Sequence, residues 1–377
     1  MITKLPKFVQ GLKKDKKYNK YLFYSQIIRN ERTKRKLTLA EIAKGICSVS
    51  YLCKFEKNDI IADESYIRAI FKRINIDFDL VGKNILVDGI ERALKAYLAS
   101  DYEALELLFH EIDDSIFNAQ NDLVKCFYFL TSKKYEEFKE TIETLDNIKD
   151  TLLYEDVGVF FFLVIQYYID THQYFEANKI LDEIEALTFT KEEVTWLLLE
   201  QKFTVSFYIK NYPKMYYYYG EIKKIDNVAY PAIRKLLIRA KVLYSLSEGD
   251  LYKAYDEFTH MNLVNFQEKY QNEFRYWQLA TYIKGGMYIK GFDEIYDNKL
   301  YYDPRFLCLL LLAAYRIKEE YYINLACTAA KDYHFDSDYP YENTFIKLML
   351  LYFRGNQKHE YIDYLKEKIL PNNQYIH

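Results

Sequence analysis

The segment GICSVSYLCKFEKN, residues 45–58, contains the two cysteines that lie closest together in the sequence, Cys47 and Cys53. Zinc sites commonly use more closely spaced cysteines or a nearby histidine. The cysteines here are six residues apart, and the histidine nearest in sequence to Cys47 is His110. We therefore expect no metal ion and no cofactor at this segment. We expect both thiols to pack in a core, with a redox-sensitive thiol as the alternative.

The sequence shows no pattern typical of a common enzyme class. It has no glycine-rich phosphate loop, no HExxH motif and no serine or cysteine in a nucleophile-elbow context. Its six histidines are dispersed through the sequence. We therefore predict that the protein is not an enzyme and that it functions by binding.

The cysteine usage and the apolar stretches indicate where the protein works. Five scattered cysteines are not a disulfide framework and suit a reducing compartment. The longest apolar stretches, residues 157–165 and 306–315, are shorter than the roughly 20 residues that a membrane-spanning helix needs. No apolar signal segment follows the N-terminal lysines. These features predict a cytoplasmic protein with no membrane partner.

The net charge of −3 hides a division of charge near residue 57. Residues 1–57 hold fifteen Lys or Arg against four acids, a net of +11, so residues 58–377 carry −14. A basic region attached to an acidic body is typical of a module that binds a polyanion. A solvated basic tail would show the same charge, so the helix signals inside this region decide between the two.

Those signals predict a compact set of short helices. Only 11 Gly and 6 Pro in 377 residues argue against an all-β fold, and residues 21–36 have the apolar spacing of an amphipathic helix. Thr38 and Glu41 form a T-x-x-E capping box at the start of a second helix, and Gly45 suits the left-handed residue that ends it. Ser48 and Asp63 are positioned to cap the third and fourth helices.

The third helix has two predicted faces. Val49, Leu52 and Phe55 recur at the spacing of an inward face. The outward face takes Ser50, Tyr51, Lys54 and Lys57. The predicted order is a helix, a tight turn and a second helix with polar outer residues. Helix-turn-helix proteins enter the major groove with this arrangement.

Residues 37–77, LTLAEIAKGICSVSYLCKFEKNDIIADESYIRAIFKRINID, resemble the DNA-binding domain of the Xre/Cro-type helix-turn-helix family. In particular they resemble the domain that begins the PlcR and Rgg type peptide-pheromone receptors (the RRNPP group) of quorum sensing. Two positions depart from that family, which usually has Gly where Asn58 stands and Pro where Ala62 stands. Asn tolerates a left-handed backbone, so the first departure is mild, and neither lies on the helix that would face the groove.

The resemblance implies a set of DNA contacts and a partner arrangement. Base contacts would come from Ser48, Ser50, Tyr51 and Lys54. Phosphate contacts would come from Arg29, Arg32, Lys36, Lys44 and Lys57, which fix register without reading sequence. The partners implied are double-stranded DNA with a two-fold operator and a second copy of the chain in a homodimer. We place this domain at residues 21–80. The extension at residues 1–20 is either a phosphate-seeking arm or an inert tail.

Residues 85–377 repeat one local plan, an apolar helix, a turn with an aromatic residue and a second helix. The turn residues are Tyr102, Tyr135, Tyr174, Tyr212, Leu251, Tyr288 and Tyr321, at steps of 33 to 39 residues. Pro231, Pro304 and Pro340 stand where first helices would begin, a position that proline tolerates. A helical-hairpin period of this length predicts a tetratricopeptide-like α-solenoid, with a generic helical bundle as the alternative. The predicted fold class is therefore all-α.

The concave wall of such a solenoid is lined by its first helices, and extended peptides bind there in proteins of this kind. Polar and aromatic side chains suit a peptide's amides, terminal carboxylate and apolar groups. Aligning the turn residues places these candidates on the wall: Gln166, Glu200, Thr204, Tyr208, Arg239, Tyr276 and Lys284.

Two functions of different classes follow. In the first, the protein is a transcription regulator whose N-terminal domain binds DNA and whose repeats bind a short signalling peptide, as the resemblance implies. In the second, it is an interaction scaffold of the Rap type, whose repeats bind a protein partner and whose N-terminal domain is not used for DNA. A DNA affinity that falls steeply with salt distinguishes the first from the second.

Overall fold

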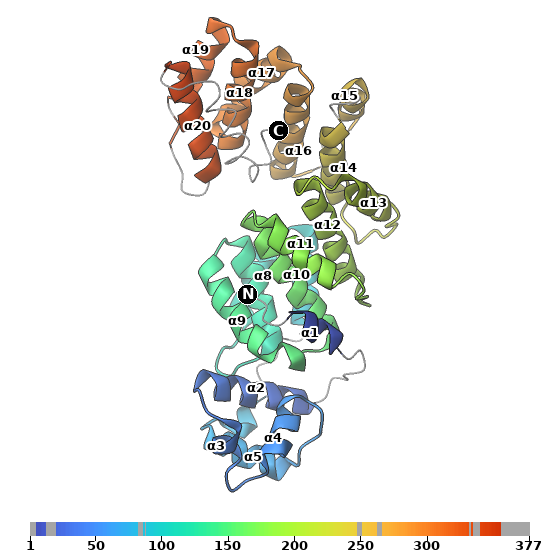
Figure 1. Cartoon of the computed structure of the whole chain (residues 1–377), viewed down its shortest axis with the longest axis vertical. Helices are drawn as coiled ribbons and strands as arrows, with labels where there is room; N and C mark the ends of the chain where they lie inside the picture. The colour runs from blue at the N-terminus through green and yellow to red at the C-terminus, as the bar shows by residue number, and fades with distance from the viewer. Residues whose placement is uncertain are drawn as a thin grey trace. The chain divides into compact units, whose positions relative to one another are not determined.

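The computed structural model describes residues 5–12, 20–81, 86, 88–246, 251–261, 266–331, 333–334 and 340–355. These residues form twenty α-helices and three 3₁₀ helices and no strand, which confirms the predicted all-α class (Figure 1). The chain divides into two compact units, Met1–Ile209 and Lys210–His377.

The first unit begins with a short helix and a bundle of four helices. Helix α1 (Leu5–Gln10) lies within the predicted extension, and its Phe8 ring packs 6.0 Å from Phe161. Lys13, Lys14, Lys16 and Lys17 of that extension lie outside the described residues. The N-terminal bundle, residues 20–81, consists of α2 (Lys20–Lys34), α3 (Leu39–Ala43), α4 (Val49–Glu56), α5 (Glu64–Arg73) and the 3₁₀ helix η1 (Phe78–Leu80).

The bundle has its own apolar core. Ile28, Leu52, Phe55, Ile67 and Phe71 come from α2, α4 and α5 and are fully buried against one another. Burying side chains of this size stabilises a fold by about 1.5–3 kcal/mol each. These few residues therefore fix the relative positions of three helices.

The helix signals predicted for the bundle are confirmed. Thr38 accepts the Glu41 amide at 3.2 Å and its own amide donates to the Glu41 carboxylate at 2.6 Å, which completes the capping box. Ser48 caps α4 by accepting the Tyr51 amide at 3.1 Å, and Asp63 caps α5 by accepting the Ser65 amide at 2.8 Å. Gly45 follows α3 with a φ of +72°, a conformation that favours glycine.

One predicted inward residue of α4 is placed wrongly by the sequence pattern. Leu52 and Phe55 are fully buried, but the Val49 side chain is 46% exposed. Val49 is the first residue of α4. The apolar spacing that buries Leu52 and Phe55 therefore does not extend to the start of the helix. The first turn of α4 therefore presents Ser48, Val49 and Ser50 to solvent together.

The remainder of the first unit contains helices that alternate as the repeat period predicts. The first helices are α6 (Gly89–Ala99), α8 (Ala119–Thr131), α10 (Tyr154–Asp170) and α12 (Glu192–Tyr208). The second helices are α7 (Tyr102–Glu111), α9 (Tyr135–Ile148) and α11 (Tyr174–Glu183), with the 3₁₀ helix η2 (Lys149–Thr151) after α9. Each second helix begins at the turn aromatic marked in the sequence.

Within this unit the first helices pack around one another. Helix α6 packs on α8, α8 on α10, α10 on α12, and α12 also reaches α6. The apolar run of α10 is buried along its length, and the rings of Tyr97, Phe127 and Phe162 meet with centroids 5.1–5.8 Å apart. The interior between these four helices is therefore filled with side chains.

The second unit contains α13 (Tyr212–Lys223), α14 (Ala232–Leu246), α15 (Leu251–Thr259), α16 (Glu268–Lys284), α17 (Tyr288–Asp297), η3 (Leu300–Tyr302), α18 (Pro304–Ile317), α19 (Glu320–Ala329) and α20 (Pro340–Phe353). Here α14, α16, α18 and α20 pack in succession. Pro304 and Pro340 are the first residues of their helices and Pro231 directly precedes α14, as expected. Tyr212, Leu251 and Tyr288 begin second helices, and Tyr321 is the second residue of α19.

Candidate nucleic-acid interface and ligand-binding faces

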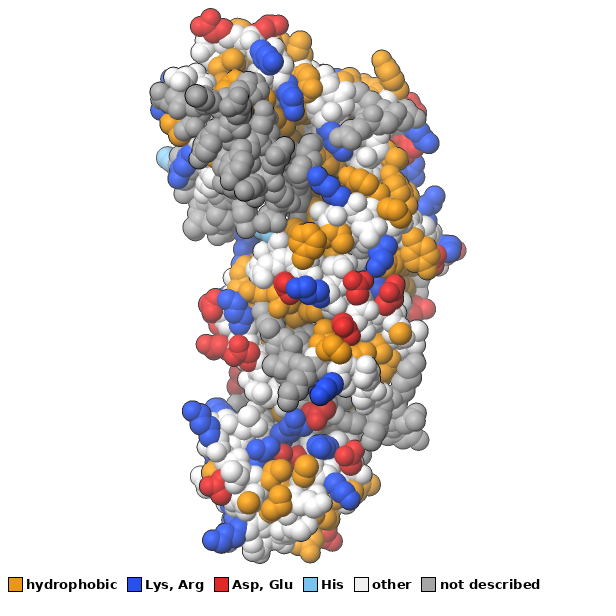
Figure 2. Space-filling model, viewed as in Figure 1, with side chains coloured by type: hydrophobic (Ala, Val, Ile, Leu, Met, Phe, Trp, Pro, Cys, Tyr) orange, Lys and Arg blue, Asp and Glu red, His pale blue; other side chains and the backbone are white. Residues whose placement is uncertain are grey.

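The outward side of α4 is the candidate nucleic-acid interface. Ser48, Ser50 and Lys54 are exposed on this helix, while Leu52 and Phe55 hold its opposite side in the core. The phosphate candidates Lys36, Lys44 and Lys57 are also exposed. On the face in view, Figure 2 shows Lys and Arg side chains over the N-terminal bundle with hydrophobic side chains between them.

Tyr51, predicted to read bases, has a structural contact that the sequence pattern did not indicate. Its hydroxyl accepts the Asp63 amide at 3.1 Å, and its ring lies edge-on to Tyr66 with centroids 5.5 Å apart. The side chain is half-buried against the core. Tyr51 therefore fixes the loop that leads into α5 and presents only part of its surface outward.

Arg32, predicted to contact phosphate, is held inside the bundle instead. Its Nε and Nη2 donate to the two carboxylate oxygens of Glu56 at 2.7 and 2.8 Å, and Nη1 donates to the Leu37 carbonyl at 3.1 Å. Glu56 is 4% exposed, and its hydrogen bond raises the pKa of Arg32. With its guanidinium engaged on three acceptors, Arg32 ties α2 to α4 and is not free for the phosphate contact that the sequence predicts.

Arg29 joins the bundle to the helices that follow it. Its Nη1 lies 2.6 Å from the Asp150 carboxylate in η2, and the nearby Gln26 side chain donates to the buried Thr151 carbonyl at 3.3 Å. Both residues belong to α2, which packs against α9 and η2. We therefore treat Arg29 as part of the attachment of α2 to α9 and η2.

Arg73 and Arg35 are structural residues that the sequence reasoning missed. Arg73 Nη1 donates to the Ile42 carbonyl at 2.7 Å and to the Lys44 carbonyl, at the end of α3 where helix carbonyls lack partners. Arg35 Nη1 donates to the Ile74 carbonyl at 2.6 Å. The acceptors lie 29–39 residues away in sequence, and no local pattern marks such pairs.

The two cysteines of the opening segment are both free thiols of intermediate exposure. Cys47 packs against the bundle core, and burial raises the pKa of its thiol. In the described part of the chain, no group of three or more His, Cys, Asp or Glu side chains is arranged to hold a metal ion. Among the same residues, no helix is long and apolar enough to cross a membrane.

In the first unit, three of the peptide candidates share one face of α12. Glu200, Thr204 and Tyr208 follow one another at four-residue steps and are half-buried. Side chains at this spacing lie along one side of a helix. The Tyr208 ring lies 4.5 Å from the Tyr174 ring of α11. We call these three residues the α12 face.

Gln166 belongs to a polar chain between α10 and α12. The Gln201 amide donates to the Phe162 carbonyl at 2.9 Å and to Gln166 Oε1 at 3.1 Å, and Gln166 Nε2 donates to Asp170 at 2.8 Å. Burial raises the pKa of Asp170 to about 7, against the opposing effect of this hydrogen bond. Gln201 is 2% exposed, and its Oε1 has no hydrogen-bond partner among the described residues.

In the second unit, the remaining candidates have different surroundings. Arg239 donates from Nε to Glu257 at 3.0 Å, and Lys284 donates to the Tyr244 carbonyl at 3.3 Å with its ammonium 4.5 Å from that ring. Tyr276 is 0% exposed and packs edge-on against Phe306. Its placement on an accessible wall is therefore wrong, because its side of α16 packs against α18. The seven peptide candidates fall in two units.

No protein-family model, no curated protein and no solved structure matches the chain. The roles assigned to the residues above therefore rest on their positions, exposure and hydrogen bonds in the described residues.

Proposed function

We propose that the protein is a sequence-specific DNA-binding transcription regulator controlled by a short signalling peptide. In this proposal α3, the turn at Gly45 and α4 form an Xre-type helix-turn-helix, and α6 to α20 form tetratricopeptide-like repeats. The resemblance to the PlcR and Rgg type receptors suggests this arrangement, a homodimer and a two-fold operator.

The observation that carries the proposal is the chemistry of the outer side of α4. Ser48, Ser50 and Lys54 are exposed donors on a helix whose other side is fixed in a core. Hydrogen-bonding side chains on a rigid helix are what a protein needs in order to read base edges in the major groove. Lys36, Lys44 and Lys57 add the positive charge that draws the bundle to phosphates.

The proposed contact set differs from the sequence prediction in three ways. Arg32 and Arg29 leave the phosphate set, because each pairs with a carboxylate of the chain. Tyr51 contributes only the part of its ring that is not packed on Tyr66. Val49 joins the base-reading set, because its exposed methyl groups match the methyl group of thymine, the apolar feature of the major groove.

The peptide would bind on the repeats and act through the attachment of α2. On the α12 face, where the sequence places this site, a carboxylate, a hydroxyl and a phenol are available to a peptide's polar groups. Arg29 and Gln26 join the bundle to η2. A peptide that binds more tightly to one arrangement of the repeats shifts the equilibrium toward that arrangement, and the two bundles of a dimer then move relative to their half-sites.

The test begins with selection of bound duplexes from a random DNA library by the full-length protein. Selected sites should show two related half-sites. The double variant Ser50→Ala with Lys54→Ala should lose binding to the selected duplex, while Lys179→Ala, which removes an exposed lysine from α11, should bind as the unaltered protein does. Absence of any enriched sequence, with no DNA binding at low salt, would contradict the proposal and favour an interaction scaffold.

A further inference from the structure

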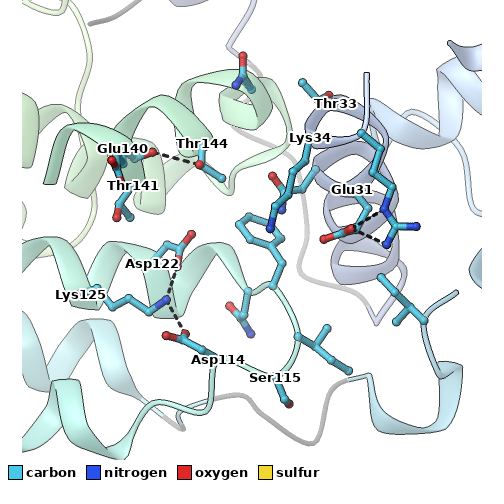
Figure 3. A pocket seen from close by; sticks show the side chains of 17 residues that line it. Glu31, Thr33, Lys34, Asp114, Ser115, Asp122, Lys125, Glu140, Thr141 and Thr144 are labelled. Atoms are coloured by element: carbon cyan, nitrogen blue, oxygen red, sulfur yellow. Dashed lines mark hydrogen bonds and ion pairs between the residues drawn. The ribbon is translucent and has the colours of Figure 1, made fainter. Parts of the chain in front are cut away.

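A polar cleft lies between the N-terminal bundle and the first repeats. Helix α2 forms one side, and α8, α9 and the loop of residues 112–118 form the other, all within the first unit (Figure 3). Its volume is about 690 Å³, within the usual range for pockets that bind small ligands. Ile116 and Phe117 of the loop pack on the bundle core. We call this space the junction cleft.

Most of the charge around the junction cleft is already paired. Lys125 Nζ lies 2.5 Å from Asp114 and 2.8 Å from Asp122, and Arg35 lies 2.9 Å from Glu31. Burial raises the pKa of Asp122, although Lys125 opposes this effect. These ion pairs form the walls of the cleft. Because their charges are already satisfied, they contribute little to binding a ligand.

Two charges of opposite sign remain, one on each wall. Lys34 extends from α2 toward the cleft, and Glu140 lies on α9 across from it (Figure 3). Both side chains are exposed, and neither forms an ion pair with another described residue. A ligand with a carboxylate at one end and an ammonium at the other would satisfy both groups, each through a charge-assisted hydrogen bond.

The hydroxyl groups of the cleft are oriented as acceptors. Thr33 donates its hydroxyl proton to the Arg29 carbonyl at 2.8 Å, Thr141 donates to Glu137 at 2.8 Å, and Thr144 donates to Glu140 at 3.1 Å. A hydroxyl that has donated its proton keeps its lone pairs for acceptance. The cleft therefore offers oxygen acceptors to N–H groups, such as those of a peptide backbone.

We infer that the junction cleft binds a short peptide with free termini, its carboxylate on Lys34 and its ammonium on Glu140. Backbone N–H groups of the peptide donate to the threonine oxygens. An inorganic anion is disfavoured, because Asp114, Asp122 and Glu140 give the lining a surplus of one negative charge over Lys34, Lys125 and the neutral Arg35–Glu31 pair. This inference rests on the proposed peptide control and moves the effector from the α12 face to the junction.

The position of the cleft gives the peptide a means of control. A ligand that contacts α2 and α9 together binds best at one distance between those helices, so its binding free energy depends on how the bundle is seated on the repeats. The coupling is reciprocal, and DNA that fixes the bundle changes peptide affinity by the same factor.

The test measures retention of synthetic random-sequence pentapeptides on the full-length protein at pH 7, read by mass spectrometry. One pool has free termini, and matched pools are N-acetylated or C-amidated. Retention from the free pool should exceed that from either capped pool. Lys34→Met and Glu140→Gln should each weaken retention by about tenfold or more, the usual worth of a hydrogen bond to a charged group. The matched controls Lys72→Met and Glu143→Gln change exposed residues outside the cleft lining and should leave retention unchanged.

Each other outcome has a defined meaning. Equal retention of free and capped pools, or no retention, overturns the inference. Loss of retention in Glu200→Gln and Tyr208→Leu, with Lys34→Met and Glu140→Gln unaffected, overturns the junction site but supports peptide control through the α12 face. DNA selection with the same protein is read separately, so a failure of DNA binding and a failure of the junction site are distinguished. Helical content and hydrogen exchange of α2 and α9 confirm that each variant is folded.

Discussion

The ion pair between Arg32 and Glu56 allows a specific prediction, because it separates two roles for Arg32: contact with a DNA phosphate, and stabilisation of the bundle. Arg32→Met removes the guanidinium and leaves the Glu56 carboxylate, which is 4% exposed, without its two hydrogen bonds of 2.7 and 2.8 Å. Breaking a buried ion pair by removing one partner typically costs 3–5 kcal/mol. The Arg32 side chain retains 19% exposure, so we expect the lower end, about 3 kcal/mol.

The assay is hydrogen exchange of the amides of α2 and α4 in the full-length protein, together with affinity for the selected duplex. Arg32→Met should raise exchange in both helices by about 100-fold, the equivalent of 3 kcal/mol. The double variant Arg32→Met with Glu56→Leu replaces both charges by apolar groups and should recover most of the protection. It should also retain DNA affinity, since Arg32 is assigned no phosphate. Our placement of Arg32 would be refuted if Arg32→Met showed normal exchange but lost DNA binding, and if the double variant did not restore that binding.

Three further predictions follow from single side chains. Val49→Ala should weaken operator binding by about fifteenfold, the worth of two buried methylene-sized groups, and only on duplexes that contain thymine. Replacing thymine with deoxyuridine should lower the affinity of the unaltered protein and leave Val49→Ala unaffected. Thr38→Ala should cost about 1 kcal/mol of stability in chemical unfolding by removing a cap, and Thr33→Ala, outside any cap, serves as the comparison. Asp170, whose pKa is raised from 3.8 to about 7, keeps its proton in the folded state while the unfolded chain releases it. Stability of the first unit should therefore fall as pH rises from about 4 to about 7, and Asp170→Asn should flatten that slope in thermal unfolding followed across this range; an unchanged slope would contradict the burial of this carboxyl.

Local signals in the sequence predicted local structure well. The capping box at Thr38, the caps at Ser48 and Asp63 and the glycine turn at Gly45 each involve residues within a few positions of one another, so their geometry follows from short-range hydrogen bonds. Six of the seven turn residues marked in the sequence are also the first residues of second helices. Helix class and helix positions were therefore accessible from the sequence.

Features that depend on distant residues were not accessible in this way. By charge alone, Arg32 and Arg29 could each bind a phosphate. Their structural role is seen only from their partners: Glu56 lies 24 positions from Arg32, and Asp150 lies more than 100 positions from Arg29. Tyr276 followed the spacing of a wall residue but is enclosed by Phe306 of a later helix. The junction cleft is formed by segments from 30 to 147, and no sequence pattern joins them.

The salt dependence of operator binding tests the central claim, that the outer side of α4 and the lysines around it bind DNA. A dimer in which Lys36, Lys44 and Lys57 of each protomer contact phosphate predicts a slope of about −5 in log K against log salt. Lys44→Met should reduce that slope by about 2, one contact for each protomer. A slope that Lys44→Met leaves unchanged, or a protein that binds no duplex at 50 mM salt, would contradict the account.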